Sequence, residues 1–249
     1  MLGPLEITVT ALLLMAAGFL IGVVGFGFGL VTSPVLLLFL DPQTVVVTIN
    51  AVAIVAFGLL FIETRHHVRY RELTPTAAAG ALGVPFGVHA LDALNPSVLR
   101  SGICALVLVL TVVVIVKTEW LIPKPRISGP ILGFGVAAMV TGLSIGGPLF
   151  VLFLIGLGME RRGVQAGMAF FFTVMYCTAA IGYFVQGLFT VERLILIAAV
   201  TPGVVFGYWL SVRFAGRMNE RTFRHLVVVV IVVTSVMVLA REVSAFLVD

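Results

Sequence analysis

The stretch GFGFGLVTSP, residues 25–34, interrupts an apolar run that extends over residues 5–40. A single straight helix of these 36 residues would be about 54 Å long, whereas the hydrocarbon core of a bilayer is about 30 Å thick. Tilt accounts poorly for such an excess. Because glycine and proline in mid-segment are typical of helix breaks, the run is predicted to form a helical hairpin. Its two arms would turn inside or across the membrane and leave on the side where they entered.

A second apolar run, residues 129–157, has the same character, with GLSIGGP at 142–148 in its middle. The two runs also resemble each other: TSPVLLLF at 32–39 matches GGPLFVLF at 146–153, and GVPFG at 83–87 matches GVVFG at 203–207. The order and the spacing of these matches indicate an internal repeat, so the second run is predicted to be a hairpin as well.

The composition identifies lipid as the solvent for most of the chain. Of the 249 residues, 61% are apolar and 10% are charged, and the mean hydropathy is +1.21. Soluble domains are nearer one half apolar and one quarter charged. The net charge of +4 does not indicate nucleic-acid binding, because the basic residues lie in short loops between apolar segments. We expect a multi-pass protein of a bacterial-type inner (cell) membrane.

Six further segments have the length of ordinary membrane-spanning helices. With the two hairpins they predict an all-α integral membrane protein made of two repeats, residues 1–118 and 119–249, within one membrane domain. Each repeat is a re-entrant or broken hairpin plus three spans. Because three is odd, the second repeat would enter from the opposite side, as in the inverted repeats of many secondary transporters. The six spans are 44–62, 75–92, 98–116, 164–186, 193–212 and 223–246.

The distribution of basic residues tests the second hairpin independently. If residues 129–157 return to their starting side, 12 of the 15 basic residues face one compartment and 3 face the other; if they cross once, the split is 8 to 7. The positive-inside rule favours the hairpin and assigns the basic-rich side to the cytoplasm. The 12 are Arg65, Arg69, Arg71, Lys117, Lys124, Arg126, Arg161, Arg162, Arg213, Arg217, Arg221 and Arg224, and the 3 are Arg100, Arg193 and Arg241.

No acidic, Lys or Arg residue lies in the middle of a predicted span, which argues against a pump built on buried carboxylates. The chain has no HExxH or P-loop pattern, and we predict neither an enzyme nor a cofactor. His66 and His67 could be ligands of a metal ion, but they lie in an arginine-rich loop without Cys or acidic ligands at a useful spacing. No metal site is predicted.

The hairpin breaks give the sharper functional signal. A helix that begins inside the membrane leaves backbone N–H groups unpaired and a partial positive charge at its tip. Two such tips near the midplane would bind an anion without Arg or Lys, with Pro34 and Pro148 each in a first helical turn. The alternatives are that the glycines serve tight helix packing, and that the polar residues of the spans only hydrogen-bond between helices. The candidate substrate-binding residues are Gly27, Gly29, Thr32, Ser33, Pro34, Asn50, Thr141, Ser144, Gly146, Gly147, Pro148 and Tyr176.

The glycine spacing over residues 18–29, the Ser33-Pro34 pair and the GGP turn at 146–148 resemble the TauE/SafE sulfite exporter family of anion permeases. The resemblance covers nearly the whole chain. It implies transport, often export, driven by an ion gradient, with sulfite, sulfoacetate and related sulfonates or organic acids as substrates.

These observations together predict a secondary transporter that holds a small anion between the hairpin tips while its two halves rock around it. A passive anion channel and a membrane scaffold without transport are the competing interpretations. The expected partners are the anion and the lipid bilayer, and no nucleic acid. The sequence leaves open whether a proton or a sodium ion couples transport, and whether the chain forms a homo-oligomer.

Overall fold

Helices make up all the regular structure of the computed structural model, which describes residues 4–25, 27–115 and 125–214. This confirms the all-α prediction. The helices are α1 (Pro4–Val24), α2 (Phe28–Leu36), α3 (Pro42–Thr64), the 3-10 turn η1 (Arg65–His67), α4 (Tyr70–Ala93), α5 (Pro96–Ile115), α6 (Pro125–Leu143), α7 (Gly147–Gly156), α8 (Arg161–Val185) and α9 (Val191–Phe214).

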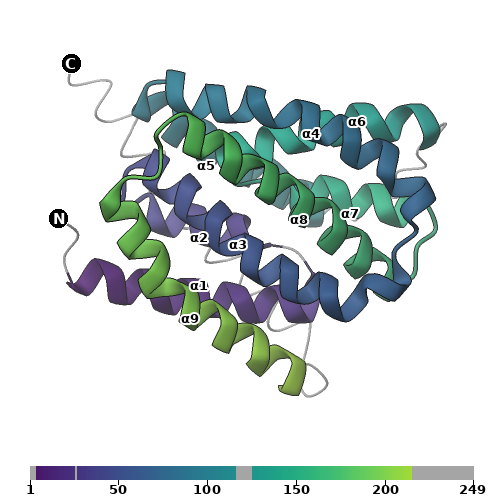
Figure 1. The fold of residues 1–249 in the computed structure, drawn as a ribbon, viewed down its shortest axis with the longest axis horizontal. Helices are drawn as coiled ribbons and strands as arrows, with labels where there is room; N and C mark the ends of the chain where they lie inside the picture. Colours follow the sequence, from purple (N-terminus) through teal and green to yellow (C-terminus); the bar gives the residue numbers. More distant parts are fainter. Residues whose placement is uncertain (1–3, 26, 116–124, 215–249) are drawn as a thin grey trace.

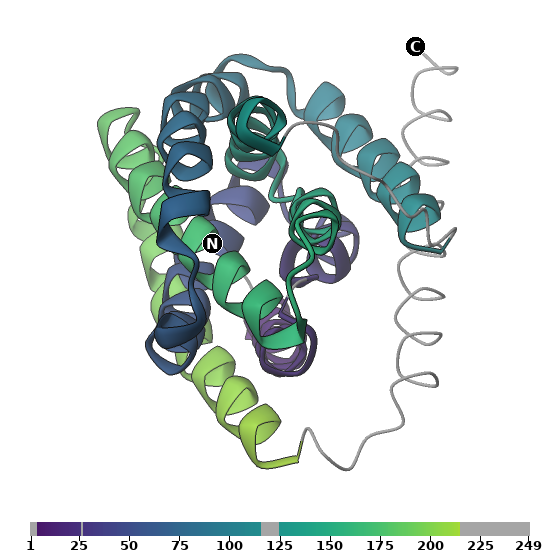
Figure 2. The same cartoon turned by 90° about the vertical axis from the view of Figure 1, so that its right-hand side faces the viewer.

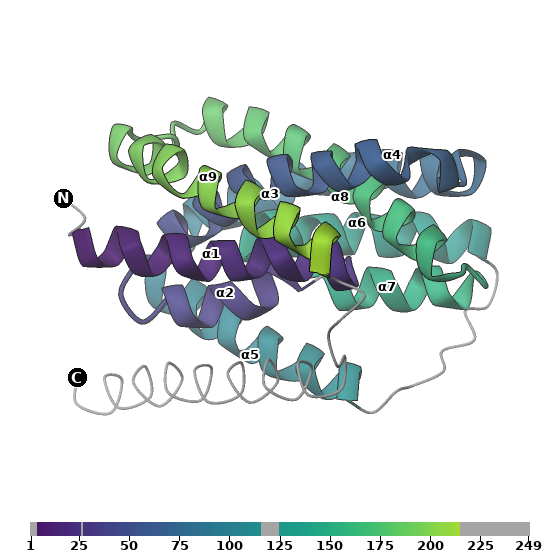
Figure 3. The same ribbon diagram turned by 90° about the horizontal axis from the view of Figure 1, so that it is seen from below.

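Both long apolar runs are interrupted, as the sequence predicts. The first breaks between α1 and α2, and the second between α6 and α7. In each pair the short second helix doubles back from the middle of the bundle, and the two pairs enter from opposite ends (Figure 3). The breaks therefore lie deep in the bundle and not at its surface.

Four described helices are long and apolar enough to cross a membrane: Glu6–Val23, Pro42–His67, Arg161–Val185 and Val191–Arg213. Large apolar side chains such as Leu82 and Phe184 are exposed on the outside of the bundle, as lipid contact requires. The predicted span at 223–246 and the predicted boundary between residues 118 and 119 lie outside the described residues.

The long helices pack in pairs that join the two halves of the chain (Figure 1). α1 lies along α9, α4 lies along α6, and α3 lies against α8. Glycine permits the close approach, because a Cβ atom at Gly87 would lie 2.3 Å from the carbonyl oxygen of Ala138, and one at Gly207 would lie 2.0 Å from that of Met15. Figure 2, which looks nearly along the helices, shows α5 and α9 on opposite sides of the bundle.

The prediction that Pro34 occupies a first helical turn is wrong. α2 starts immediately after Gly27, so Pro34 lies inside the helix, near its C-terminal end. Because Pro34 has no N–H, the helix lacks one hydrogen bond near its C-terminal end, and it ends two residues further on. Pro148, in contrast, lies in the first turn of α7, as predicted. The first break therefore includes Gly25 and Gly27, and the second is at residues 144–146.

Arg193, in the first turn of α9, ties one end of the bundle together. Its Nε donates to Thr44 Oγ1 (2.9 Å), its Nη1 donates to the carbonyl of Leu188 (2.9 Å), and its Nη2 donates to Gln43 Oε1 (3.2 Å). The carboxylate of Asp41, which also caps the N-terminus of α3, lies 3.6 Å from the guanidinium. The Arg193 side chain thereby joins the start of α3 to the α8–α9 turn.

Candidate functional site

The two helix breaks meet in the middle of the bundle. A Cβ atom at Gly29 would lie 1.8 Å from the carbonyl oxygen of Ser144, so only glycine permits this contact. Gly27 precedes α2 with φ 99°, a left-handed conformation that favours glycine. Ser144 is itself left-handed, with φ 60°, and this backbone strain is held in place by its surroundings.

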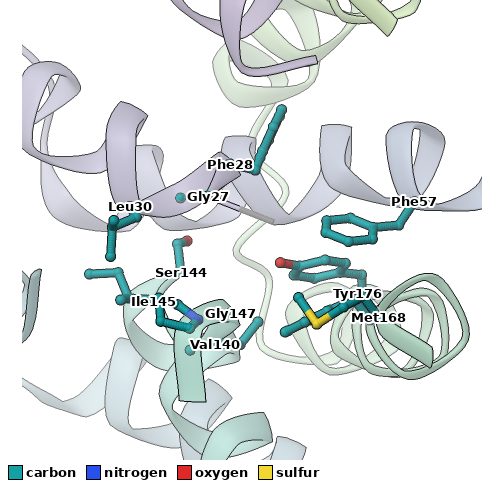
Figure 4. A pocket seen from close by; sticks show the side chains of 14 residues that line it. Gly27, Phe28, Leu30, Phe57, Val140, Ser144, Ile145, Gly147, Met168 and Tyr176 are labelled. Atoms are coloured by element: carbon teal, nitrogen blue, oxygen red, sulfur yellow. The ribbon is translucent and has the colours of Figure 1, made fainter. Parts of the chain in front are cut away.

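A cavity of about 310 Å³, including its opening, lies where the two breaks meet (Figure 4). The breaks form one wall, and side chains from α3 and α8 form the other. The lining residues are Gly27, Phe28, Gly29, Leu30, Phe57, Val140, Ser144, Ile145, Gly146, Gly147, Pro148, Met168, Phe172 and Tyr176.

Two helix N-termini present backbone donors at this cavity. The first intrahelical bonds run from Val31 N to the Gly27 carbonyl (3.1 Å) and from Phe150 N to the Gly146 carbonyl (3.4 Å). The amides before these donors have no partner within their own helix. Because α2 has nine residues and α7 has ten, both are real helices with a positive N-terminal end.

Tyr176 on α8 supplies a side-chain donor to the same space. The residue is only 4% exposed, and its hydroxyl points into the cavity toward the two breaks (Figure 4). That hydroxyl has no hydrogen-bond partner among the residues that the structure describes. A hydroxyl donor beside two helix N-termini suits a ligand that accepts hydrogen bonds.

Asn50 on α3 and Tyr183 on α8 hold the second break in position. The amide of Asn50 donates to the Val140 carbonyl (3.1 Å) and to the Tyr183 hydroxyl (2.5 Å). Tyr183 in turn donates to the carbonyl of Thr141. The Asn50 amide oxygen accepts from the Ser144 hydroxyl (3.1 Å). The bond from Tyr183 satisfies the Thr141 carbonyl near the end of α6, and the bonds of Asn50 hold Val140 and the strained Ser144 in place.

The first break is held in a comparable way by the start of α8. Arg161 Nη2 donates to the carbonyl of Val23, at the end of α1, over 3.0 Å. Gln165 Nε2 lies 3.5 Å from the same oxygen. A cation at a helix C-terminus also complements the helix dipole. Each break is therefore anchored by polar side chains on the long helices.

The structure brings seven of the predicted site residues to the cavity: Gly27, Gly29, Ser144, Gly146, Gly147, Pro148 and Tyr176. The other five do not line it: Thr32, Ser33, Pro34, Asn50 and Thr141. Thr32 and Thr141 donate instead to carbonyls of their own helices, Phe28 (2.6 Å) and Ala137 (2.8 Å). Ser33 is fully buried, and its hydroxyl has no partner in the described part of the chain.

Seven of the lining residues were not predicted from the sequence: Phe28, Leu30, Phe57, Val140, Ile145, Met168 and Phe172. Helical spacing could have indicated Phe57, Met168 and Phe172, and also Tyr183, which anchors the second break. Phe57 lies seven residues after Asn50, and Phe172 and Tyr183 lie four before and seven after Tyr176. Residues at these intervals share one helix face, so the face that carries a buried polar residue also carries its neighbours in the site.

A protein-family model described as "Sulfite exporter TauE/SafE" matches residues 10–238, most of the chain. No curated protein and no solved structure matches the chain.

Proposed function

This chain belongs to the sulfite exporter TauE/SafE family, and on that basis we propose that it carries a small anion by alternating access, with the anion held where the two helix breaks meet. Membership implies a multi-pass membrane transporter of sulfite-like anions rather than an enzyme. The proposal adds the site, the mechanism and a bacterial inner membrane as the location, with export as the direction.

One observation carries the proposal: two helix N-termini share one cavity with the Tyr176 hydroxyl, which has no partner among the described residues. Amide N–H groups and a hydroxyl are donors, and an anion accepts from all of them at once. The closeness of Gly29 to Ser144 keeps the two tips together. An anion there would contact both halves of the chain, as alternating access around a central site requires.

The packing of the helices supports an inverted repeat. In such a repeat α1, α2, α3 and α4 correspond to α6, α7, α8 and α9. The contact between α4 and α6 is then equivalent to the contact between α9 and α1, and these two helix pairs have the most extensive contacts. The contact of α4 with α8 likewise becomes that of α9 with α3, and both are present. The contact of α3 with α8 maps onto itself. Gly87 and Gly207, from the two matched segments of sequence, make equivalent close contacts.

Flux into proteoliposomes tests the proposal and separates it from its competitors. Purified protein is reconstituted, and uptake of sulfite and of methanesulfonate is measured with and without proton and sodium gradients. Saturable uptake that an ion gradient drives supports the carrier. Very fast current that follows only the membrane potential would identify a channel. The absence of flux for a panel of sulfonates, sulfite and carboxylates would leave a scaffold.

A further inference from the structure

The cavity offers partial positive charge but no full cation. Among its lining residues in the described chain, only Ser144 and Tyr176 have polar side chains, and none is Lys, Arg or His. The Ser144 hydroxyl already donates to Asn50. Each helix N-terminus is equivalent to roughly half an elementary charge, so two tips compensate about one negative charge. A second negative charge would be buried without compensation, which is costly.

The wall opposite the helix tips is aromatic and apolar (Figure 4). The ring centroid of Phe57 lies 5.2 Å from that of Phe172 and 5.7 Å from that of Tyr176. Phe172 and Tyr176 are stacked, and Met168 lines the same side. The face of an aromatic ring is electronegative, so this wall does not stabilise an anion. It does stabilise an alkyl group that it removes from water.

We propose that the substrate is a singly charged organic anion with a short apolar group, whose anionic end lies at the helix tips and whose apolar end lies against Phe57, Phe172 and Met168. This inference rests on the proposed function and narrows it. The three side chains then determine specificity, because they distinguish an alkyl sulfonate or carboxylate from an inorganic anion. Sulfite, which is partly doubly charged near neutral pH, and sulfoacetate, which carries two charges, fit this cavity less well.

Binding to the full-length wild-type protein provides the first test. Calorimetric titration in detergent compares methanesulfonate, ethanesulfonate, propanesulfonate, sulfoacetate and sulfite. Each added methylene is expected to tighten binding about fourfold. Sulfoacetate is expected to bind at least about tenfold more weakly than propanesulfonate, which is close to it in size but carries one charge fewer.

Substitution of the aromatic wall provides the second test, with a matched control on the same helix. Phe57→Ala removes a ring that lines the cavity, whereas Phe61→Ala removes one that contacts Phe170 outside it. With Phe57→Ala, the gain per methylene is expected to fall below about twofold, while the affinity for methanesulfonate changes by less than about threefold. With Phe61→Ala, the fourfold increment is expected to remain. Thermal unfolding of each variant verifies that it is folded.

The outcomes separate this inference from the proposed function. If sulfite or sulfoacetate binds as tightly as propanesulfonate, or if added methylenes have no effect, the inference is wrong while the anion site stands. An equal loss for all five anions in Phe57→Ala would also overturn it. If none of the five anions binds the folded wild-type protein, the proposed function itself fails.

Discussion

Replacing Tyr176 with phenylalanine removes one hydroxyl from the cavity and leaves the ring in place. The hydroxyl points toward the two helix tips and has no partner among the described residues, so its loss breaks no bond that the protein itself makes there. A hydrogen bond to a charged group contributes about 1.5–3 kcal/mol. The affinity for methanesulfonate is therefore expected to fall roughly ten- to a hundredfold, since about 1.4 kcal/mol corresponds to a factor of ten.

The thermal stability of the empty Tyr176→Phe variant should be close to that of the wild type, because this hydroxyl makes no hydrogen bond within the described residues. Tyr208→Phe is the matched control, since the Tyr208 hydroxyl is bonded to Glu63 (2.6 Å) away from the cavity. This control should lose some stability and keep its affinity. Titration calorimetry and thermal unfolding measure the two quantities. If Tyr176→Phe binds methanesulfonate with wild-type affinity, the proposal that this hydroxyl donates a hydrogen bond to the bound anion is refuted.

Three further substitutions test how the site is held together. Gly29→Ala places a Cβ atom 1.8 Å from the carbonyl oxygen of Ser144, so uptake into proteoliposomes should fall to background. The control Gly58→Ala, with open space around it, should transport normally. Transport by Gly29→Ala would contradict the close contact of the two helix tips. Asn50→Leu removes the bonds from Asn50 to Val140, Tyr183 and Ser144 and should lower the unfolding free energy by about 1–3 kcal/mol. An unchanged melting temperature would argue against this network. Arg193→Met breaks three part-buried hydrogen bonds at one end of the bundle and should lower the melting temperature by several degrees, about 2–4 °C per kcal/mol. The half-exposed ion pair of Arg69 should contribute less than about 1 kcal/mol, so equal effects of Arg193→Met and Arg69→Met would contradict the assignment.

Much of the fold was predictable because the bilayer constrains it strongly. An apolar run of 36 residues cannot cross once without excess length, so the glycines at 25–29 had to mark a break. The same reasoning located the break before Gly147. It failed in detail at Pro34, because a proline also fits inside a short helix when the bond that it removes lies near the C-terminal end.

The site was only partly predictable, because sequence spacing does not reveal which hydroxyl groups remain free. Thr32 and Thr141 bond to carbonyls of their own helices, as threonine in a membrane helix often does. Asn50 is essential to the geometry but serves as an anchor, since its bonds go to Ser144, Val140 and Tyr183. That role depends on the distance between α3 and the end of α6, which no pattern in the sequence gives.

The most direct test of the central claim is a high-resolution structure of the full-length protein with 3-bromopropanesulfonate, whose bromine can be located by anomalous scattering. The account predicts the sulfonate between the two helix tips, about 2.7–3.2 Å from tip amide nitrogens and from the Tyr176 hydroxyl, with the bromine against Phe57 and Phe172. A sulfonate bound elsewhere, with none in the cavity beside the Gly29–Ser144 contact, would contradict it.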